Sequence, residues 1–237
     1  MPTLQINKLS VKHNDDILVD LITQNNDEII INSSLALVGQ SGSGKSLTLK
    51  TILNMIPSNL DVHFDYKSDF ELSTKNIGFI PQNPFTSLSP MTKIYKQFFC
   101  SEKKVNELLS MVKLPSNFKN KFPIQLSGGQ LQRIVIAIAL SNNPKILLLD
   151  EPTTALDDDS KENILSLFKE IQKKLGFIII FVSHDTNSIK NICEDIIILK
   201  NGNICESGKL LDILNNPQHN YTKELITSNF ENREFRV

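Results

Sequence analysis

The fold of this chain is decided by one stretch, Gly39-Gln40-Ser41-Gly42-Ser43-Gly44-Lys45-Ser46. It follows an apolar run at residues 34–38 and leads into an apolar-periodic run at residues 47–53, which predicts a strand, a glycine-rich turn and a helix. Glycines let main-chain N–H groups close around phosphate oxygens, and a helix N-terminus adds partial positive charge. The stretch therefore predicts a P-loop that binds a nucleotide. The alternative is a flexible Gly/Ser turn before a helix.

The side chains of this P-loop have separate tasks. Lys45 is expected to reach the β- and γ-phosphates, and Ser46 to offer its hydroxyl to Mg²⁺. The residues expected to bind the nucleotide are Gly39, Ser41, Gly42, Ser43, Gly44, Lys45, Ser46 and Leu47.

Composition sets limits on the class of protein. The 237 residues suffice for a substantial core, either as one domain or as a core with a smaller subdomain. The net charge is −1, and no basic tail or Lys/Arg block is present. Nucleic acid is therefore not the expected partner.

Cysteines and apolar runs indicate the compartment. Cys100, Cys193 and Cys205 lack a CxxC pair, which indicates neither a disulfide framework nor a zinc site and fits a reducing cytosol. The first residues have no signal-peptide pattern, and the longest apolar runs are far shorter than the ~20 residues that span a bilayer. Any role at a membrane is therefore expected to come through a partner.

Strands and helices alternate along the chain. Residues 4–38 alternate polar and apolar positions and predict three or four short strands, whereas residues 58–74 have weak periodicity and predict only irregular strand or loop. Apolar runs at 146–149 and 177–182 predict buried strands, with an amphipathic helix at 164–175 between them. Buried strands that alternate with helices indicate a mostly parallel, two-sided sheet, so the fold class is α/β.

The pattern becomes helical between residues 83 and 143. A turn-rich loop at 83–90 precedes apolar residues at helical spacing, and a second glycine turn at 126–130 opens another helix. We expect an inserted helical subdomain here. Further on, Asn201-Gly202 between apolar runs predicts a hairpin turn, and the tail from Leu210 predicts one or two short helices.

A pair of carboxylates follows the apolar run at 146–149. A carboxylate there emerges at the edge of the sheet where α/β proteins bind their ligands. Asp150 is expected to hold Mg²⁺ through water, and Glu151 to take the proton of a water that attacks the γ-phosphate. The alternative is an acidic turn before Pro152.

His184 and Gln82 also follow predicted strands. His184 comes one residue after Ser183, and we expect it to contact the γ-phosphate. The alternative is a surface histidine or a satisfied core histidine. Gln82 follows the strand predicted at 77–80 and is expected to touch water or Mg²⁺ while linked to a movable loop. Its alternative is an exposed glutamine before a turn.

Ser127-Gly128-Gly129 is a second anion-binding pattern. A serine and two glycines at a helix N-terminus can hold a phosphate, yet the chain already has a P-loop, and no second lysine accompanies this turn. The pattern makes sense if it serves the nucleotide of another copy. The alternative is a glycine-rich helix start without a ligand.

These motifs, in this order, resemble the nucleotide-binding subunit of ATP-binding cassette (ABC) transporters over nearly the whole chain. By this resemblance Leu126–Gln130 is the signature motif, Gln82 the Q-loop glutamine, His184 the switch histidine and Ala155–Asp157 the D-loop. The resemblance implies a P-loop NTPase (RecA-like) core with a mostly parallel sheet, an antiparallel β subdomain and an inserted helical subdomain. The implied domains are a core at 1–82 and 144–208, a helical subdomain at 83–143 and a tail at 209–237.

The resemblance also implies ATP and Mg²⁺ as ligands. The implied catalytic residues are Glu151, His184 and Gln82, and the implied metal-binding residues are Ser46, Gln82 and Asp150. In this family two cassettes pack head to tail, so Ser127 and Gly129 of one subunit close the ATP on the P-loop of the other.

The implied partners follow from that architecture. They are a second ABC ATPase subunit, identical or different, and integral-membrane permease subunits that dock on the helical subdomain and the loop after Gln82. An extracytoplasmic solute-binding protein is an indirect partner. The implied location is the cytoplasmic face of the inner membrane, as a peripheral subunit.

Three segments look like the dipeptide, oligopeptide and nickel import branch: residues 81–90, 121–123 and 217–225. Peptide members usually carry a longer C-terminal extension with cysteines, whereas this sequence stops at Val237, so the expected cargo is nickel or a nickel chelate. A di- or oligopeptide is the alternative. The family commonly stacks adenine on an aromatic ring upstream of the P-loop. This sequence has none in the turn at 13–16, so His13 is expected to stack instead, and a loosely held base is the alternative.

Two competing classes differ in visible features. A soluble, non-transport ABC ATPase that acts on DNA or ribosomes usually has tandem cassettes, a coiled-coil insertion, zinc cysteines or a basic arm, and the sequence has none of these. A P-loop kinase or GTPase would have no use for the motif at 126–130.

Overall fold

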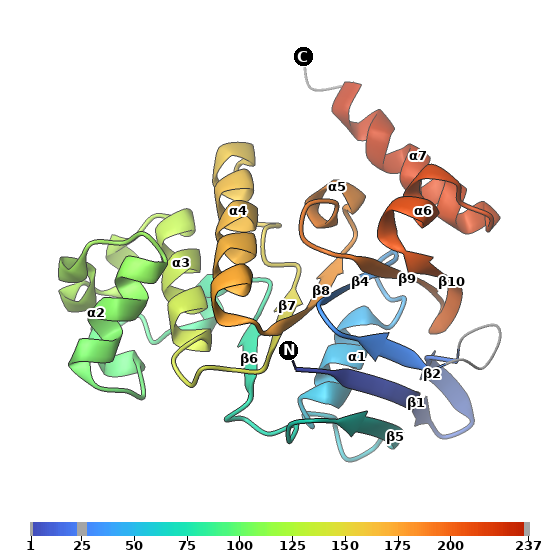
Figure 1. Cartoon of the computed structure of the whole chain (residues 1–237), viewed down its shortest axis with the longest axis horizontal. Coiled ribbons are helices and arrows are strands. Elements are labelled where there is room, and N and C mark those ends of the chain that lie inside the picture. The colour runs from blue at the N-terminus through green and yellow to red at the C-terminus, as the bar shows by residue number, and fades with distance from the viewer. Residues whose placement is uncertain (1, 23–27, 235–237) are drawn as a thin grey trace. The chain divides into compact units, whose positions relative to one another are not determined.

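The computed structural model describes residues 2–22 and 28–234. The chain forms two compact units, which we describe separately (Figure 1). The first unit consists of Met1–Leu72 and Ile178–Val237, and the second consists of Ser73–Phe177. The α/β fold class expected from the sequence is confirmed.

The first unit contains an antiparallel layer around β1 (Leu4–His13). β1 pairs with β2 (Asp16–Asp20), with β3 (Ile29–Ile31) and, along most of its length, with β5 (Asp61–Ser68). β1 to β4 are the strands expected before the P-loop. β5 was not expected as a regular strand, although Val62, Phe64 and Tyr66 alternate with polar residues along it, and none of its side chains is buried.

The first unit also contains a parallel layer. β4 (Ser34–Val38) lies between β8 (Ile178–Ser183) and β9 (Asp195–Lys200) and is parallel to both. All residues of β4 and β8 are buried, which explains their nearly continuous apolar sequences.

A hairpin joins β9 to β10 (Asn203–Lys209). Its turn residues, Asn201 and Gly202, have φ values of 49° and 80°, which agrees with the hairpin turn expected from this dipeptide. The helices of the first unit are α1 (Lys45–Ile52), α5 (Thr186–Ile189), α6 (Leu210–Asn215) and α7 (Asn220–Glu234).

The second unit is built on two parallel strands, β6 (Ile77–Ile80) and β7 (Ile146–Asp150). Its α-helices are α2 (Glu102–Met111), α3 (Gly128–Ala139) and α4 (Asp158–Leu175). Its 3₁₀ helices are η1 (Pro84–Ser87), η2 (Ile94–Gln97), η3 (Ser116–Asn120) and η4 (Pro123–Gln125). A Cβ atom at Gly78 of β6 would lie 2.8 Å from the carbonyl oxygen of Ala139, so α3 approaches this strand more closely than a side chain would allow.

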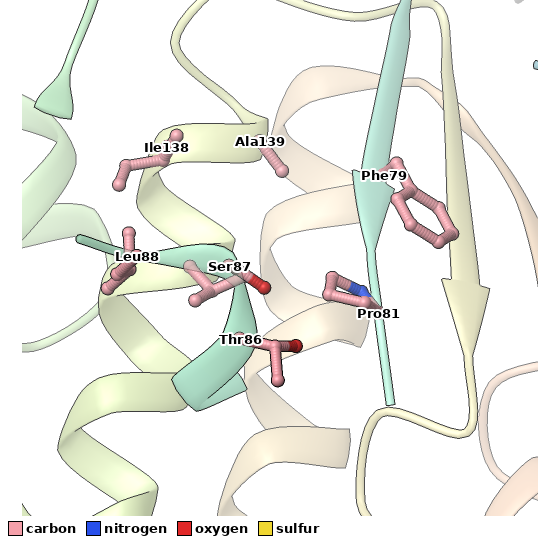
Figure 2. Close-up of a pocket in the computed structure, with 8 residues that line it drawn as sticks. Phe79, Pro81, Thr86, Ser87, Leu88, Ile138 and Ala139 are labelled. Carbon is pink, nitrogen blue, oxygen red and sulfur yellow. The ribbon is translucent and has the colours of Figure 1, made fainter. Parts of the chain in front are cut away.

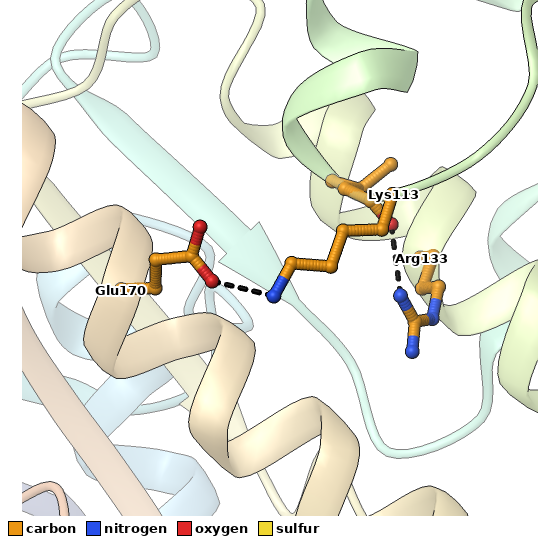
Figure 3. Close-up of polar contacts among 4 residues, drawn as sticks. Lys113, Arg133 and Glu170 are labelled. Carbon is orange, nitrogen blue, oxygen red and sulfur yellow. Dashed lines mark hydrogen bonds and ion pairs between the residues drawn. The ribbon is translucent and has the colours of Figure 1, made fainter.

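Polar contacts link the three α-helices of the second unit (Figure 3). Lys113, after α2, forms an ion pair of 2.6 Å with Glu170 of α4. Arg133 of α3 donates to the carbonyl oxygen of Val112 at 3.0 Å. The ion pair is more than half exposed and is therefore worth at most about 1 kcal/mol. Buried apolar side chains supply most of the stability.

Phe168 of α4 offers a test of that core, because it is 0% exposed. We expect Phe168→Ala to lower the free energy of unfolding by about 3–5 kcal/mol, since it leaves a cavity. Phe99→Ala is the matched control, because Phe99 lies in the same unit and is 89% exposed. Urea denaturation measures both changes. Equal losses in the two variants would contradict the placement of Phe168 in the core.

Candidate functional site

The P-loop has the geometry of an anion cradle. It leaves β4 and enters α1, and Gly42 and Gly44 have φ values of 80° and 100°. Only glycine adopts these angles without strain. Gly44 is the N-cap of α1, so the loop leads directly into a helix N-terminus, whose partial positive charge attracts a phosphate.

Lys45 lies inside this cradle. Its side chain is buried, and its Nζ donates to the carbonyl oxygens of Gly39 at 2.8 Å and of Gln40 at 2.9 Å. Ser43 is also buried, and its Oγ has no hydrogen-bond partner within residues 2–22 and 28–234. A buried hydroxyl and a buried ammonium in one loop fit a phosphate ligand, because both gain a strong acceptor when it binds.

Strands of the first unit hold the P-loop tightly. A Cβ atom at Gly39 would lie 2.2 Å from the carbonyl oxygen of Leu199, so no larger residue fits without displacing the loop. The amide of Gly202, in the β9–β10 turn, donates to the carbonyl oxygen of Ser43 at 3.2 Å. The loop is therefore positioned by β9 and the hairpin turn as well as by its own sequence.

His184 and the P-loop leave the same edge of the first unit. β8 and β4 are parallel, and Ser183 pairs with Val38, so the next residues, His184 and Gly39, emerge side by side. Asp185 then caps α5 by accepting from the amide of Asn187 at 2.8 Å. His13 lies at the end of β1, where it is exposed.

Glu151 and Gln82 meet in the second unit. Ile80 pairs with Leu149, so the residues beyond β6 and β7 emerge together. The Gln82 Nε2 donates to the Glu151 Oε2 at 3.1 Å, and the Thr154 hydroxyl donates to the same oxygen at 3.2 Å. No sequence pattern indicated this role of Thr154.

The backbone of Glu151 is also unusual. Its φ is 47°, in the left-handed region that residues other than glycine rarely adopt. Such strain persists only where the surroundings enforce it, and it is common at functional sites. Asp150 comes just before it, as the last residue of β7.

Ser127 begins α3 with a capping box. Its Oγ accepts from the amide of Gln130 at 3.3 Å, and the Gln130 side chain accepts from the Ser127 amide at 3.2 Å. A Cβ atom at Gly129 would make only ordinary contact, 3.4 Å from the Ser160 Oγ. Ser127 is exposed, so it can cap the helix and still face a ligand.

The structure thus gathers the expected site residues in two groups. The first unit holds the P-loop, His184 and His13, and the second holds Gln82, Asp150, Glu151, Ser127 and Gly129. One further residue at the P-loop was missed. Tyr221 contacts Gln40, and no local pattern could reveal a contact across 181 positions.

The strand–P-loop–helix unit and the carboxylates after a buried parallel strand define a P-loop nucleoside triphosphatase. A model of the ABC transporter family matches residues 27–154, and the chain belongs to that family. The resemblance seen in the sequence is therefore confirmed. Its nucleotide-binding domain is an ATP hydrolase.

Two curated relatives are ATP-binding proteins of transport systems. The oligopeptide transport ATP-binding protein OppD of Bacillus subtilis (strain 168) is 39% identical over 223 residues, which are 82% of this chain and 62% of that protein. The metal-staphylopine import system ATP-binding protein CntD of Staphylococcus aureus (strain NCTC 8325 / PS 47) is 34% identical over 234 residues, 88% of this chain and 86% of that protein. The chain thus spans less than two thirds of the length of OppD.

A solved structure agrees with the fold. The chain is similar to the ATP-binding cassette MJ0796, in its dimeric post-hydrolysis structure with ADP and Pi, with a TM-score of 0.66 and 32% identity. The match covers 89% of this chain and 99% of that one. Within the part of the chain that the structure describes, no helix has the length and apolar character of a membrane span.

The capping role of Ser127 can be measured apart from catalysis. We expect Ser127→Ala to lower the free energy of unfolding by about 1 kcal/mol, because α3 loses its cap. Ser127→Asp should retain most of that stability, since aspartate also caps helices. Ser110→Ala, at an exposed position inside α2, is the control and should cost nothing. Denaturant titration measures the free energy of unfolding of the three variants. An unchanged free energy of unfolding in Ser127→Ala would contradict the capping role.

Proposed function

We propose that this chain is the ATPase subunit of an ABC importer that takes up a small solute, with nickel or a nickel chelate as the first candidate. The observation that carries the proposal is the P-loop cradle, with its buried Lys45 and Ser43, in a chain of the ABC transporter family. In this function ATP binding and hydrolysis close and reopen a dimer of cassettes, and that motion drives the permease.

The P-loop binds the phosphates of ATP in this proposal. Its contributing residues are Gly39, Ser41, Gly42, Ser43, Gly44, Lys45, Ser46 and Leu47. Lys45 exchanges the carbonyl oxygens that it now contacts for phosphate oxygens, which are stronger acceptors. Ser46, Gln82 and Asp150 would hold Mg²⁺, which neutralises charge on the phosphates when it is bound.

Glu151 is the proposed general base. The hydrogen bonds from Gln82 and Thr154 orient its carboxylate, and an oriented carboxylate can take the proton of an attacking water. Gln82 also begins the loop that leads to η1, so a movement of that loop reaches the carboxylate directly. His184 contacts the γ-phosphate in this proposal and stabilises the charge that develops on it.

Ser127 and Gly129 serve the ATP of a second subunit. An exposed cap at the N-terminus of a 12-residue helix is suited to close a phosphate site from outside. The dimeric structure of MJ0796 supports the presence of a second subunit. The second subunit is a copy of this chain or a different cassette. His13 is proposed to stack on the adenine of the bound ATP, in place of an aromatic ring.

The second unit carries a surface that suits a permease helix. A pocket of about 400 Å³ lies between β6, η1 and α3, and its lining is mostly apolar (Figure 2). The lining residues are Phe79, Pro81, Thr86, Ser87, Leu88, Val135, Ile138 and Ala139. Phe85, Met91 and Phe99 expose apolar side chains on the same unit.

We propose that a cytosolic helix of the permease docks on this pocket. The chain would then lie at the cytoplasmic face of the inner membrane. A solute-binding protein is then an indirect partner.

The cargo is the least constrained part of the proposal. The name of CntD, a metal-staphylopine import protein, supports a metal chelate, whereas the name of OppD supports an oligopeptide. Reconstitution of the chain with its permease distinguishes them. Stimulation of ATPase activity by nickel or its chelate, and not by peptides, would support the first candidate, and the reverse result would support the second.

Lys45→Ala tests the ATPase assignment. We expect it to abolish ATP hydrolysis, because binding of the β- and γ-phosphates requires the ammonium group. The circular dichroism spectrum should stay unchanged, because the fold does not require that group. Lys50→Ala is the matched control, since Lys50 lies exposed on the same helix. Near-normal turnover by Lys45→Ala would disprove the site.

Glu151→Gln tests the general base. We expect this variant to bind ATP, to lose nearly all hydrolysis and to accumulate as an ATP-dependent dimer, because the glutamine amide cannot accept the proton of the attacking water. Size-exclusion chromatography with and without ATP measures the dimer. If the native partner is a different cassette, that subunit is added. Dimers that form equally well without ATP would argue against the base role.

A further inference from the structure

The segment at residues 217–225 reaches the P-loop from the far end of the sequence. The Tyr221 hydroxyl accepts a hydrogen bond of 3.0 Å from the backbone amide of Gln40, across 181 positions. Tyr221 is 4% exposed, so this contact lies inside the first unit. Gln40 is the second residue of the P-loop.

Two residues of the β9–β10 hairpin fix this segment. Glu206 of β10 accepts from the amides of Gln218 at 2.8 Å and of His219 at 3.1 Å. Burial acts to raise the pKa of Glu206, but these hydrogen bonds outweigh it and hold the pKa below its usual range. The Lys200 ammonium lies 4.6 Å from the centre of the Tyr221 ring, which adds a cation–π contact. Glu206 therefore holds the backbone just before Tyr221, and Lys200 contacts the face of its ring.

Gln40 is held from two directions. Its amide donates to Tyr221, and its carbonyl oxygen accepts from the Lys45 Nζ at 2.9 Å. The same carbonyl oxygen accepts from the amide of Ser43 at 3.2 Å, which closes the first turn of the loop. The Gln40 amide belongs to the Gly39–Gln40 peptide group, whose carbonyl oxygen also accepts from the Lys45 Nζ at 2.8 Å. Loss of the tyrosine hydroxyl would therefore remove one of the two hydrogen bonds that orient this group.

We propose that Tyr221 is a positioning residue of the nucleotide site: its hydroxyl holds the first turn of the P-loop in the shape that receives the phosphates. The inference rests on the proposed ATPase function, but it assigns no contact between Tyr221 and ATP. Positioning of this kind lowers the cost of ordering the loop when ATP binds, so it acts on affinity. It leaves the groups that take part in hydrolysis unchanged.

Tyr221→Phe in the full chain tests the inference, because it removes only the hydroxyl and keeps the ring beside Lys200. We expect the Kd and the KM for ATP to rise by about two- to tenfold, the effect of one hydrogen bond. We expect kcat to stay within about twofold of its original value, the signature of lost uniform binding. Tyr66→Phe is the matched control, since Tyr66 is an exposed tyrosine of β5 in the same unit, and its values should not change.

A second variant, Glu206→Gln, keeps the tyrosine hydroxyl and weakens the attachment of residues 218 and 219. We expect a smaller rise in KM in the same direction. An unchanged KM for Tyr221→Phe, or a fall in kcat alone, would overturn the inference. If neither the wild-type protein nor Tyr66→Phe bound ATP, the proposed function would instead be overturned.

Discussion

The structure depends on the close approach of the P-loop backbone to the strands around it. Amide groups can converge on a phosphate only if no side chain stands between them and if the chain turns through left-handed angles at Gly42 and Gly44. The position of Gly39 against the carbonyl oxygen of Leu199 leaves no room for a Cβ atom. The cradle is therefore set by packing before any ligand arrives.

In the second unit, strand pairing positions the candidate site residues. Two short parallel strands end in register, and this register brings Gln82 to Glu151. The left-handed backbone at Glu151 turns the chain sharply after β7. Of the two neutral donors at its carboxylate, Gln82 links the proposed base to the segment before η1, and Thr154 comes from the turn after β7. In the proposed function, a movement of this segment would therefore reach the base directly.

The sequence was most informative where residues are buried on both faces or needed for local geometry. Strands β4, β7 and β8 were expected from their apolar runs, because a strand covered on both sides has few polar positions. The glycine turn and the Asn201-Gly202 hairpin were expected because their angles are tied to residue type. β5 was missed, because its alternating Val62, Phe64 and Tyr66 form no continuous apolar run and none of its side chains is buried.

The sequence by itself determined the chemistry of the protein: a P-loop, two carboxylates after a buried strand, and a family defined by their order. These features are local, so adjacent residues encode them. Only the tertiary structure decided which distant groups meet, such as Tyr221 with Gln40 and Leu199 with Gly39. The physical reason is that these contacts depend on the order and register of strands, which arise from packing over the whole unit and leave no trace in any single stretch of sequence.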